Sequence, residues 1–123
     1  MRTTHLLAVA LAGALAACNG STSPYGGGTS GGGTPAANQV FMQSLAFTPA
    51  TRTVSVGTTV QWVNQDGVTH TVTKDSGPGA NFNQSVGGGS SFSVTFDSAG
   101  TYQYHCTIHG APGSGMHGTI VVQ

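Results

Sequence analysis

The C-terminal segment of residues 102–122 carries the side chains with the clearest capacity for chemistry. Cys106 is followed three residues later by His109, and Met116 stands just before the β-rich run that closes the chain. Thiolate, imidazole and thioether groups are soft or borderline ligands, which select copper over magnesium or calcium. A trigonal copper site with a weak axial methionine needs a second imidazole. The best-placed candidate is His70, so the sequence predicts one copper ion held by His70, Cys106, His109 and Met116.

These four side chains come from two distant parts of the chain, so a rigid scaffold must bring them together. His70 is expected at the start of one strand and Cys106 at the end of another. His109 is expected in the loop after Cys106, and Met116 just before the last strand. Along a regular strand the Cys-x-x-His spacing sends the two side chains to opposite faces, whereas in a turn both can converge. We therefore expect the site at one end of a β-scaffold.

Length and charge limit the other functions that the chain could have. It has 123 residues, enough for one domain, and only three basic and three acidic residues, which cancel. Nucleic-acid binding needs a basic face that neutralises phosphates, so no nucleic-acid partner is expected. No paired carboxylates, Ser/His/Asp arrangement or phosphate-binding loop is apparent, and we expect no enzyme activity.

The N-terminus reads as a targeting segment. Residues 1–17 combine Arg2 with an apolar run that is too short to span a bilayer but suits a signal peptide. The sequence Leu-Ala-Ala-Cys ending at Cys18 resembles the lipobox of bacterial lipoproteins, which implies lipidation of Cys18. The alternative is an ordinary cleaved signal with a chance cysteine. On the lipoprotein interpretation the protein is exported and anchored by its lipid, in the periplasm or at the cell surface.

Composition divides the rest of the chain into a tether and a domain. Residues 18–37 are rich in Gly, Ser, Thr and Pro and are expected to form a flexible linker. Residues 38–123 are expected to form the folded domain, a monomer with one unpaired cysteine, Cys106. A free thiol in an exported protein is open to oxidation, whereas a metal-bound thiolate is protected.

The domain shows short β-branched and aromatic runs separated by turn residues, and no sustained helical periodicity. This pattern predicts an all-β, two-sheet Greek-key sandwich of about seven to eight strands. One inner face is expected to carry Val54, Val56, Val60 and Trp62, and the other Phe92, Val94 and Phe96. Residues 76–90 are expected to form a long irregular connection, with a brief strand or helical turn possible around Phe82. The strands are expected at 39–47, 52–56, 59–64, 69–73, 91–96, 100–105 and 118–122.

Residues 38–123 resemble a cupredoxin of the plastocyanin, pseudoazurin and amicyanin group. The matching segments are FTP at 47–49, VG at 56–57, VQWVN at 60–64, HTV at 70–72, GTY at 100–102, YHC at 104–106, His109, and Met116 followed by GTIVV at 118–122. The resemblance implies a blue (type 1) copper protein that carries single electrons between redox partners. It also implies that a partner docks near His109, and that the Thr71 amide faces the thiolate.

The loop between His109 and Met116 departs from the family. Six residues intervene where two to four are common, and three of them are glycines that could return Met116 to the metal. The alternatives for the axial position are a backbone carbonyl near Gly67, or no axial bond.

Two other metal-binding functions fit the same residues. One is a copper-binding or trafficking lipoprotein without fast electron transfer. The other is a zinc site, although structural zinc rarely uses methionine. His105 and His117 each neighbour a proposed ligand and are expected to point away from it. Asp66, Asp75 and Asp97 are expected in turns.

Overall fold

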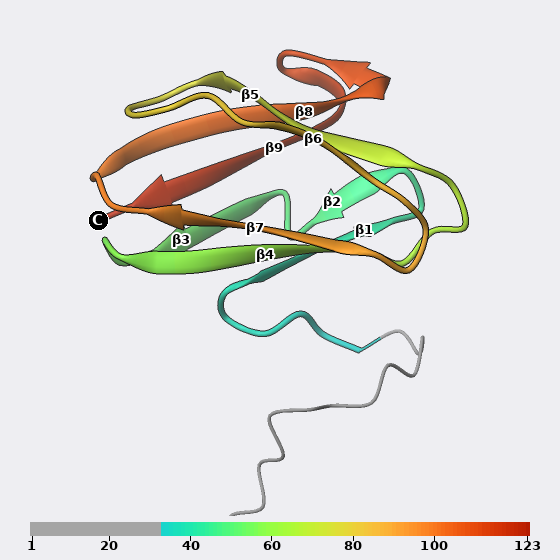
Figure 1. The fold of residues 1–123 in the computed structure, drawn as a ribbon, viewed down its shortest axis with the longest axis horizontal. Helices are drawn as coiled ribbons and strands as arrows, with labels where there is room; N and C mark the ends of the chain where they lie inside the picture. Colours follow the sequence, from blue (N-terminus) through green and yellow to red (C-terminus); the bar gives the residue numbers. More distant parts are fainter. Residues whose placement is uncertain (1–32) are drawn as a thin grey trace, which may run out of the picture.

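The computed structural model describes residues 33–123, which form a sandwich of nine strands in two sheets (Figure 1). The expected signal segment 1–17 and Cys18 lie outside the described residues. One sheet has the strand order β2-β1-β4-β7. Its strands are β1 (Gln39–Gln43), β2 (Ala46–Thr48), β4 (Thr58–Asn64) and β7 (Ser91–Phe96).

The second sheet has five strands in the order β3-β9-β8-β5-β6. Its strands are β3 (Thr51–Val54), β5 (His70–Ser76), β6 (Asn83–Val86), β8 (Gly100–Ala111) and β9 (Ser114–Val122). The pairs β1–β4 and β3–β9 are parallel, and the remaining pairs are antiparallel. The all-β, two-sheet architecture expected from the sequence is confirmed, with one strand more than the upper estimate.

The first predicted strand, 39–47, is divided into β1 and β2 by a two-residue turn. Ser44 and Leu45 both have positive φ, 54° and 58°. Tight hairpins require this conformation, and usually show it in the sequence through Asn or Gly. Here neither residue is of that kind. The Asp66 carboxylate accepts hydrogen bonds from both turn amides, at 2.8 Å from Ser44 N and 3.1 Å from Leu45 N.

Two other expectations about the strands were wrong in part. Val56 is 49% exposed, not a core residue, because β3 ends at Val54 and the chain turns at Gly57 with φ 87°. The expected irregular connection 76–90 contains β6, which pairs with β5 and begins just after Phe82.

The expected division of the inner faces was also wrong, because Val60 and Trp62 of β4 pair with Val94 and Phe92 of β7 in the same sheet, whereas Val54 lies in the other. Phe92 and Val94 are partly buried and pack against the core.

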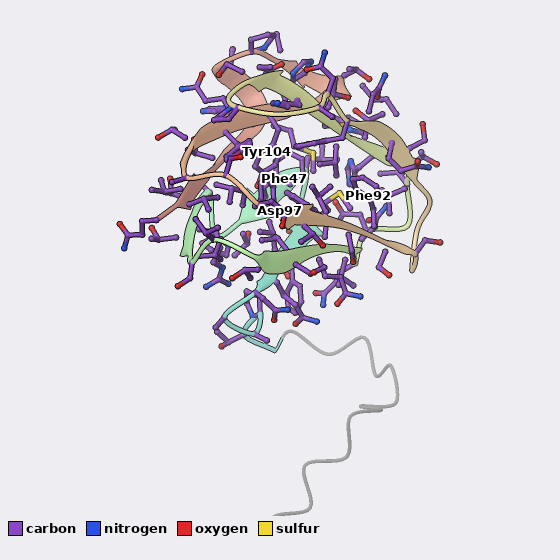
Figure 2. The ribbon with its side chains drawn as sticks, turned by 60° about the vertical axis from the view of Figure 1, so that its left-hand side comes forward. Phe47, Phe92, Asp97 and Tyr104 are labelled. Atoms are coloured by element: carbon purple, nitrogen blue, oxygen red, sulfur yellow. The ribbon has the colours of Figure 1, made fainter. Side chains whose placement is uncertain are left out.

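The core between the sheets is dominated by aromatic side chains. Trp62 of β4 and Tyr104 of β8 are fully buried, with ring centroids 5.3 Å apart and planes at 83°. Phe47 meets the Tyr104 ring edge to face at 4.7 Å, between the two layers (Figure 2). Burying such rings contributes a large apolar area, on the order of 150–250 Å² each. This core fixes the position of β8 relative to β4, and so the position of Cys106, two residues beyond Tyr104.

The two ends of the sandwich differ. The β8–β9 hairpin and the β4–β5 connection lie at one end, on the right in Figure 1. The turn between β7 and β8, which contains Asp97, lies at the other end. The chemistry-bearing residues therefore gather at one end of the scaffold, as the sequence predicts.

Candidate metal centre

A wide interruption of the β8–β9 ladder creates the site. His105 pairs with His117, and the next pair is Gly110 with Gly115. The four residues Cys106 to His109 therefore lie opposite the single residue Met116. Bulges of this kind bend a strand and redirect its side chains. This bulge is the local reason that a thiol and an imidazole only three residues apart can face one point.

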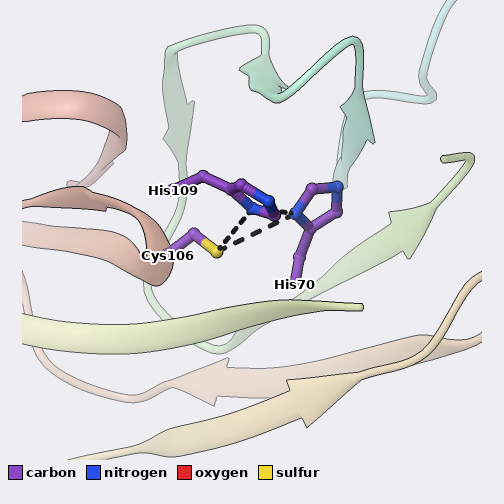
Figure 3. A group of neighbouring side chains, drawn as sticks. All are labelled: His70, Cys106 and His109. Carbon is purple, nitrogen blue, oxygen red and sulfur yellow. Dashed lines mark hydrogen bonds between the residues drawn. The ribbon is translucent and has the colours of Figure 1, made fainter. Parts of the chain in front are cut away.

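The structure brings His70, Cys106 and His109 together (Figure 3). The Nδ1 atoms of the two imidazoles lie 3.1 Å apart. Cys106 Sγ lies 3.8 Å from His70 Nδ1 and 3.6 Å from His109 Nδ1. The side chains of His70 and Cys106 are fully buried, whereas His109 is partly exposed.

These distances fit a single metal ion. Imidazole nitrogens bind a zinc-like ion at about 2.0–2.1 Å and thiolate sulfur at about 2.3 Å, so donors that share one ion lie within about 4.4 Å of each other. All three separations satisfy this limit. One thiolate and two imidazoles form the donor set of trigonal type 1 copper sites. The cluster of His70, Cys106 and His109 therefore fits a single type 1 copper ion.

The sulfur of Cys106 also receives a hydrogen bond from the scaffold. The backbone N–H of Thr71 donates to Cys106 Sγ at 3.3 Å, as expected from the resemblance. A donor aimed at a ligating sulfur stabilises negative charge on it and tunes the metal. Because Thr71 follows His70 in β5, one strand supplies both a nitrogen donor and this hydrogen bond.

The hydroxyl of Thr71 has a separate role, which the sequence left open. It accepts a hydrogen bond of 2.8 Å from the backbone N–H of Thr107, the residue after Cys106. Its oxygen also lies 3.1 Å from the hydroxyls of Thr73 and Thr107. These hydrogen bonds link β5 to the bulge that contains Cys106 and His109.

The far nitrogen of His70 contacts Asp66, a residue that the sequence suggested only for a turn. His70 Nε2 lies 2.8 Å from Asp66 Oδ2. Burial opposes ionisation of this carboxyl, but the Leu45 amide, the His70 ring and the Ser44 amide favour its charged form. The net result is a pKa of Asp66 below its ordinary value.

Asn64 is a second residue of the site that sequence reasoning missed. Its buried side chain donates to the carbonyls of Val68, at 2.8 Å, and Val86, at 2.9 Å, and accepts from the N–H of Asp66 at 2.9 Å. The last contact is an Asx-turn, in which an Asn side chain bonds the backbone two residues on, so Asn64 itself is the available sequence signal. Asn64 thus shapes the connection that leads into His70.

Met116, the predicted axial ligand, is buried on β9, the strand that pairs with β8. It is 2% exposed and stands on β9 directly opposite the Cys106–His109 bulge. It shares the buried face of β9 with Ile120 and Val122. The six residues between His109 and Met116 do not form a flexible loop. They continue the ladder as a tight hairpin that turns at Pro112-Gly113.

The other two histidines of the described chain point away from the site, as expected. His105 Nδ1 lies 2.6 Å from Asp75 Oδ1. His117 is exposed, with Nδ1 2.9 Å from the Gly115 carbonyl oxygen. The expectation that Asp75 lies in a turn was wrong, because it belongs to β5, where the pairing with β8 shifts by one residue.

Fold and site together define a small β-sandwich protein with a sulfur-containing metal centre, in which two donors are buried and His109 is partly exposed. A model of the copper binding proteins of the plastocyanin/azurin family matches residues 35–123. The chain therefore belongs to this family.

Individual relatives agree with that assignment. A plastocyanin of Scenedesmus fuscus is 40% identical over 89 residues, which cover 65% of this chain and 89% of the relative. A chloroplastic plastocyanin of Tetradesmus obliquus is 36% identical over 65% of this chain, and an amicyanin of Paracoccus denitrificans is 37% identical over 57%. The matched regions span 60% and 53% of those two relatives.

Solved structures show the same similarity. A Cu(I) form of a mutant amicyanin superimposes with a TM-score of 0.61 at 32% identity, covering 69% of this chain and 80% of the amicyanin. A purple cupredoxin from Nitrosopumilus maritimus gives a TM-score of 0.58 at 27% identity, covering 69% of this chain and 98% of that protein.

Proposed function

We propose that this protein carries single electrons between redox partners through a type 1 copper site held by His70, Cys106, His109 and Met116. The observation that carries this proposal is the convergence of three donor atoms, all within 4.8 Å of one another, at one end of a rigid sandwich. Relatives named plastocyanin and amicyanin support it. A bound copper ion would supply the chemistry by alternating between Cu(II) and Cu(I).

The residues divide the work between them. Cys106 provides the thiolate, and the Thr71 amide stabilises its charge. His70 and His109 complete the trigonal set, with His70 buried and His109 partly exposed. Because the ladders of β5, β8 and β9 hold these groups, the scaffold keeps one geometry for both oxidation states. Little rearrangement is then needed for electron transfer.

Exposed apolar side chains stand next to residues of the site in the chain. Three of the four large exposed hydrophobic side chains of the described residues are Leu45, Val68 and Ile108. Leu45 is in the turn bonded to Asp66, Val68 is two residues before His70, and Ile108 precedes His109. We infer that redox partners dock here, beside the edge of His109. Charge is scarce, so we expect association to depend only mildly on salt.

Copper loading of the full chain tests the proposed function. Adding Cu(II) to the purified protein should give an intense visible thiolate-to-Cu(II) band and reversible one-electron voltammetry. A copper-trafficking protein would instead prefer Cu(I), exchange it readily and lack that colour. Absence of both the band and the reversible wave would reject the electron carrier.

Replacing Met116 by leucine tests the axial position. The side chain keeps its size and apolar character but loses the sulfur, a weak donor that stabilises Cu(II). We expect Met116→Leu to keep the visible band and raise the reduction potential by about 60 mV or more, one tenfold change in the ratio of affinities for the two oxidation states. An unchanged potential in voltammetry would show that Met116 is not the axial ligand.

Lipidation at Cys18 is the proposed means by which the protein is anchored to a membrane. We propose a signal peptide at 1–17, a lipidated Cys18, and a linker to residue 37 that lets the domain of residues 38–123 reach partners in the periplasm or at the cell surface as a monomer. The support is the sequence before Cys18, which resembles a lipobox. Between residues 33 and 123, no helix is long and apolar enough to cross a membrane.

A single substitution tests the anchor. A serine at position 18 cannot accept the lipid through sulfur, so Cys18→Ser should move the protein from the membrane fraction to the soluble fraction after export. Fractionation followed by immunoblotting measures the change. Retention of the variant in membranes would overturn the lipoprotein interpretation.

A further inference from the structure

We infer that Asp66 is a positioning residue that fixes the His70 ring for metal binding and favours Cu(II) over Cu(I). The inference rests on the proposed function, because it concerns the same copper site. It is carried by one carboxylate that contacts both the far nitrogen of His70 and the neighbouring β1–β2 turn.

The first step concerns the proton on His70. An ionised carboxylate only accepts hydrogen bonds, so the 2.8 Å contact with Asp66 places the ring proton on Nε2. The Nδ1 lone pair is then free, and Nδ1 is the atom that faces Cys106 Sγ and His109 Nδ1. Asp66 thus selects the tautomer that can bind a metal.

The second step concerns the position of the ring. The two Asp66 oxygens divide three contacts: Oδ1 accepts from Ser44 N, and Oδ2 accepts from Leu45 N and contacts His70 Nε2. The Ser44–Leu45 turn has positive φ at both residues, an uncommon conformation without glycine. The carboxylate therefore ties a turn of one sheet to a ligand of the other. This contact fixes the orientation of the fully buried His70 ring.

The third step concerns the electronic effect. A carboxylate that accepts the far N–H of a ligating histidine raises the basicity of the nitrogen at the metal. A stronger donor, with a negative charge close behind it, stabilises the more highly charged Cu(II). Loss of that charge should therefore lower the affinity for Cu(II) more than the affinity for Cu(I), and the reduction potential should rise.

The variant Asp66→Asn tests the inference in the full chain. The amide keeps the size of the side chain but carries no charge, and its NH₂ group cannot accept. We expect affinity for Cu(II) to fall 10–100-fold, the range usual for loss of such an outer partner. We expect the Cu(II)/Cu(I) affinity ratio to fall about tenfold, equivalent to a rise of 59 mV for one electron.

Asp97→Asn is the matched control. It removes the same charge from an exposed aspartate at the opposite end of the sandwich, so its potential should equal that of the unaltered protein. If Asp66→Asn also leaves the potential unchanged while the unaltered protein is blue, the inference fails and the proposed function stands. If the unaltered protein shows no blue copper site, the proposed function itself fails.

A measurement on the unaltered protein avoids dependence on the folding of the variant. In the copper-free chain, nitrogen-15 NMR should show the His70 proton on Nε2 and slow exchange of that proton with water. A proton on Nδ1, or rapid exchange at Nε2, would overturn the assignment of Asp66.

Discussion

Cys106→Ser should abolish the intense visible band of the copper-loaded protein. The band requires a thiolate that donates charge to Cu(II), and a serine hydroxyl remains protonated at neutral pH and has no sulfur to replace it. The affinity for Cu(II) should also fall by more than the 10–100-fold that loss of an outer partner costs, because a direct ligand is removed. Absorption and spin-resonance spectra of the full chain with one equivalent of Cu(II) measure both effects.

The chain supplies its own control for this experiment. Cys18 is the other cysteine, and it belongs to the N-terminal segment rather than to the domain. Cys18→Ser should keep the full visible band. If Cys106→Ser kept the band, Cys106 would not be the ligand responsible for it, and the proposed type 1 site would be rejected. Since Cys106 is fully buried and similar in size to serine, the variant should still fold.

The cluster of His70, Cys106 and His109 could be predicted from the sequence because thiol and imidazole side chains are few in the domain and chemically distinctive. The Cys-x-x-His spacing followed by Met116 needs a short reversal of the chain, and the structure provides one in the bulge opposite Met116. Strand positions followed from β-branched and aromatic runs. Val60 and Trp62 are fully buried, as their alternation indicated.

What could not be predicted depends on contacts between distant residues. The turn at Ser44–Leu45 carries no glycine or asparagine. It is stabilised by the Asp66 carboxylate, about twenty residues away, which accepts hydrogen bonds from both turn amides. The role of Asp66 at His70 was hidden for the same reason, because it requires the turn and the ring to be in place together. Val56 resembles a strand residue by type, but the turn that starts beside it leaves it exposed.

The hairpin between His109 and Met116 shows why a loop rich in glycine need not be flexible. Gly110 and Gly115 face each other across the ladder, and the two backbones approach closely there. A Cβ built on Gly110 would lie 2.6 Å from Met116 N, 2.8 Å from Met116 O and 2.8 Å from Ser114 O. Each of these atoms is backbone, so the strain cannot be relieved by turning a side chain.

Gly110→Ala should therefore open the hairpin that positions His109 and Met116. We expect the free energy of unfolding of the copper-free chain to fall by about 1–3 kcal/mol, the usual cost of overpacking. Gly87→Ala is the matched control, because its Cβ would meet only Ser90 Oγ, at 3.9 Å. Its effect should stay within about 0.5 kcal/mol. Denaturant unfolding followed by far-ultraviolet circular dichroism measures both.

The copper-loaded protein should lose more stability than the copper-free protein in the Gly110→Ala variant. A ligand that binds only the folded state stabilises it in proportion to the logarithm of its affinity, so each tenfold loss of copper affinity removes about a further 1.4 kcal/mol. The visible and spin-resonance spectra should change as well, because both His109 and Met116 flank the opened ladder. Equal losses with and without copper, together with an unchanged spectrum, would show that the hairpin stabilises the fold without positioning the metal ligands.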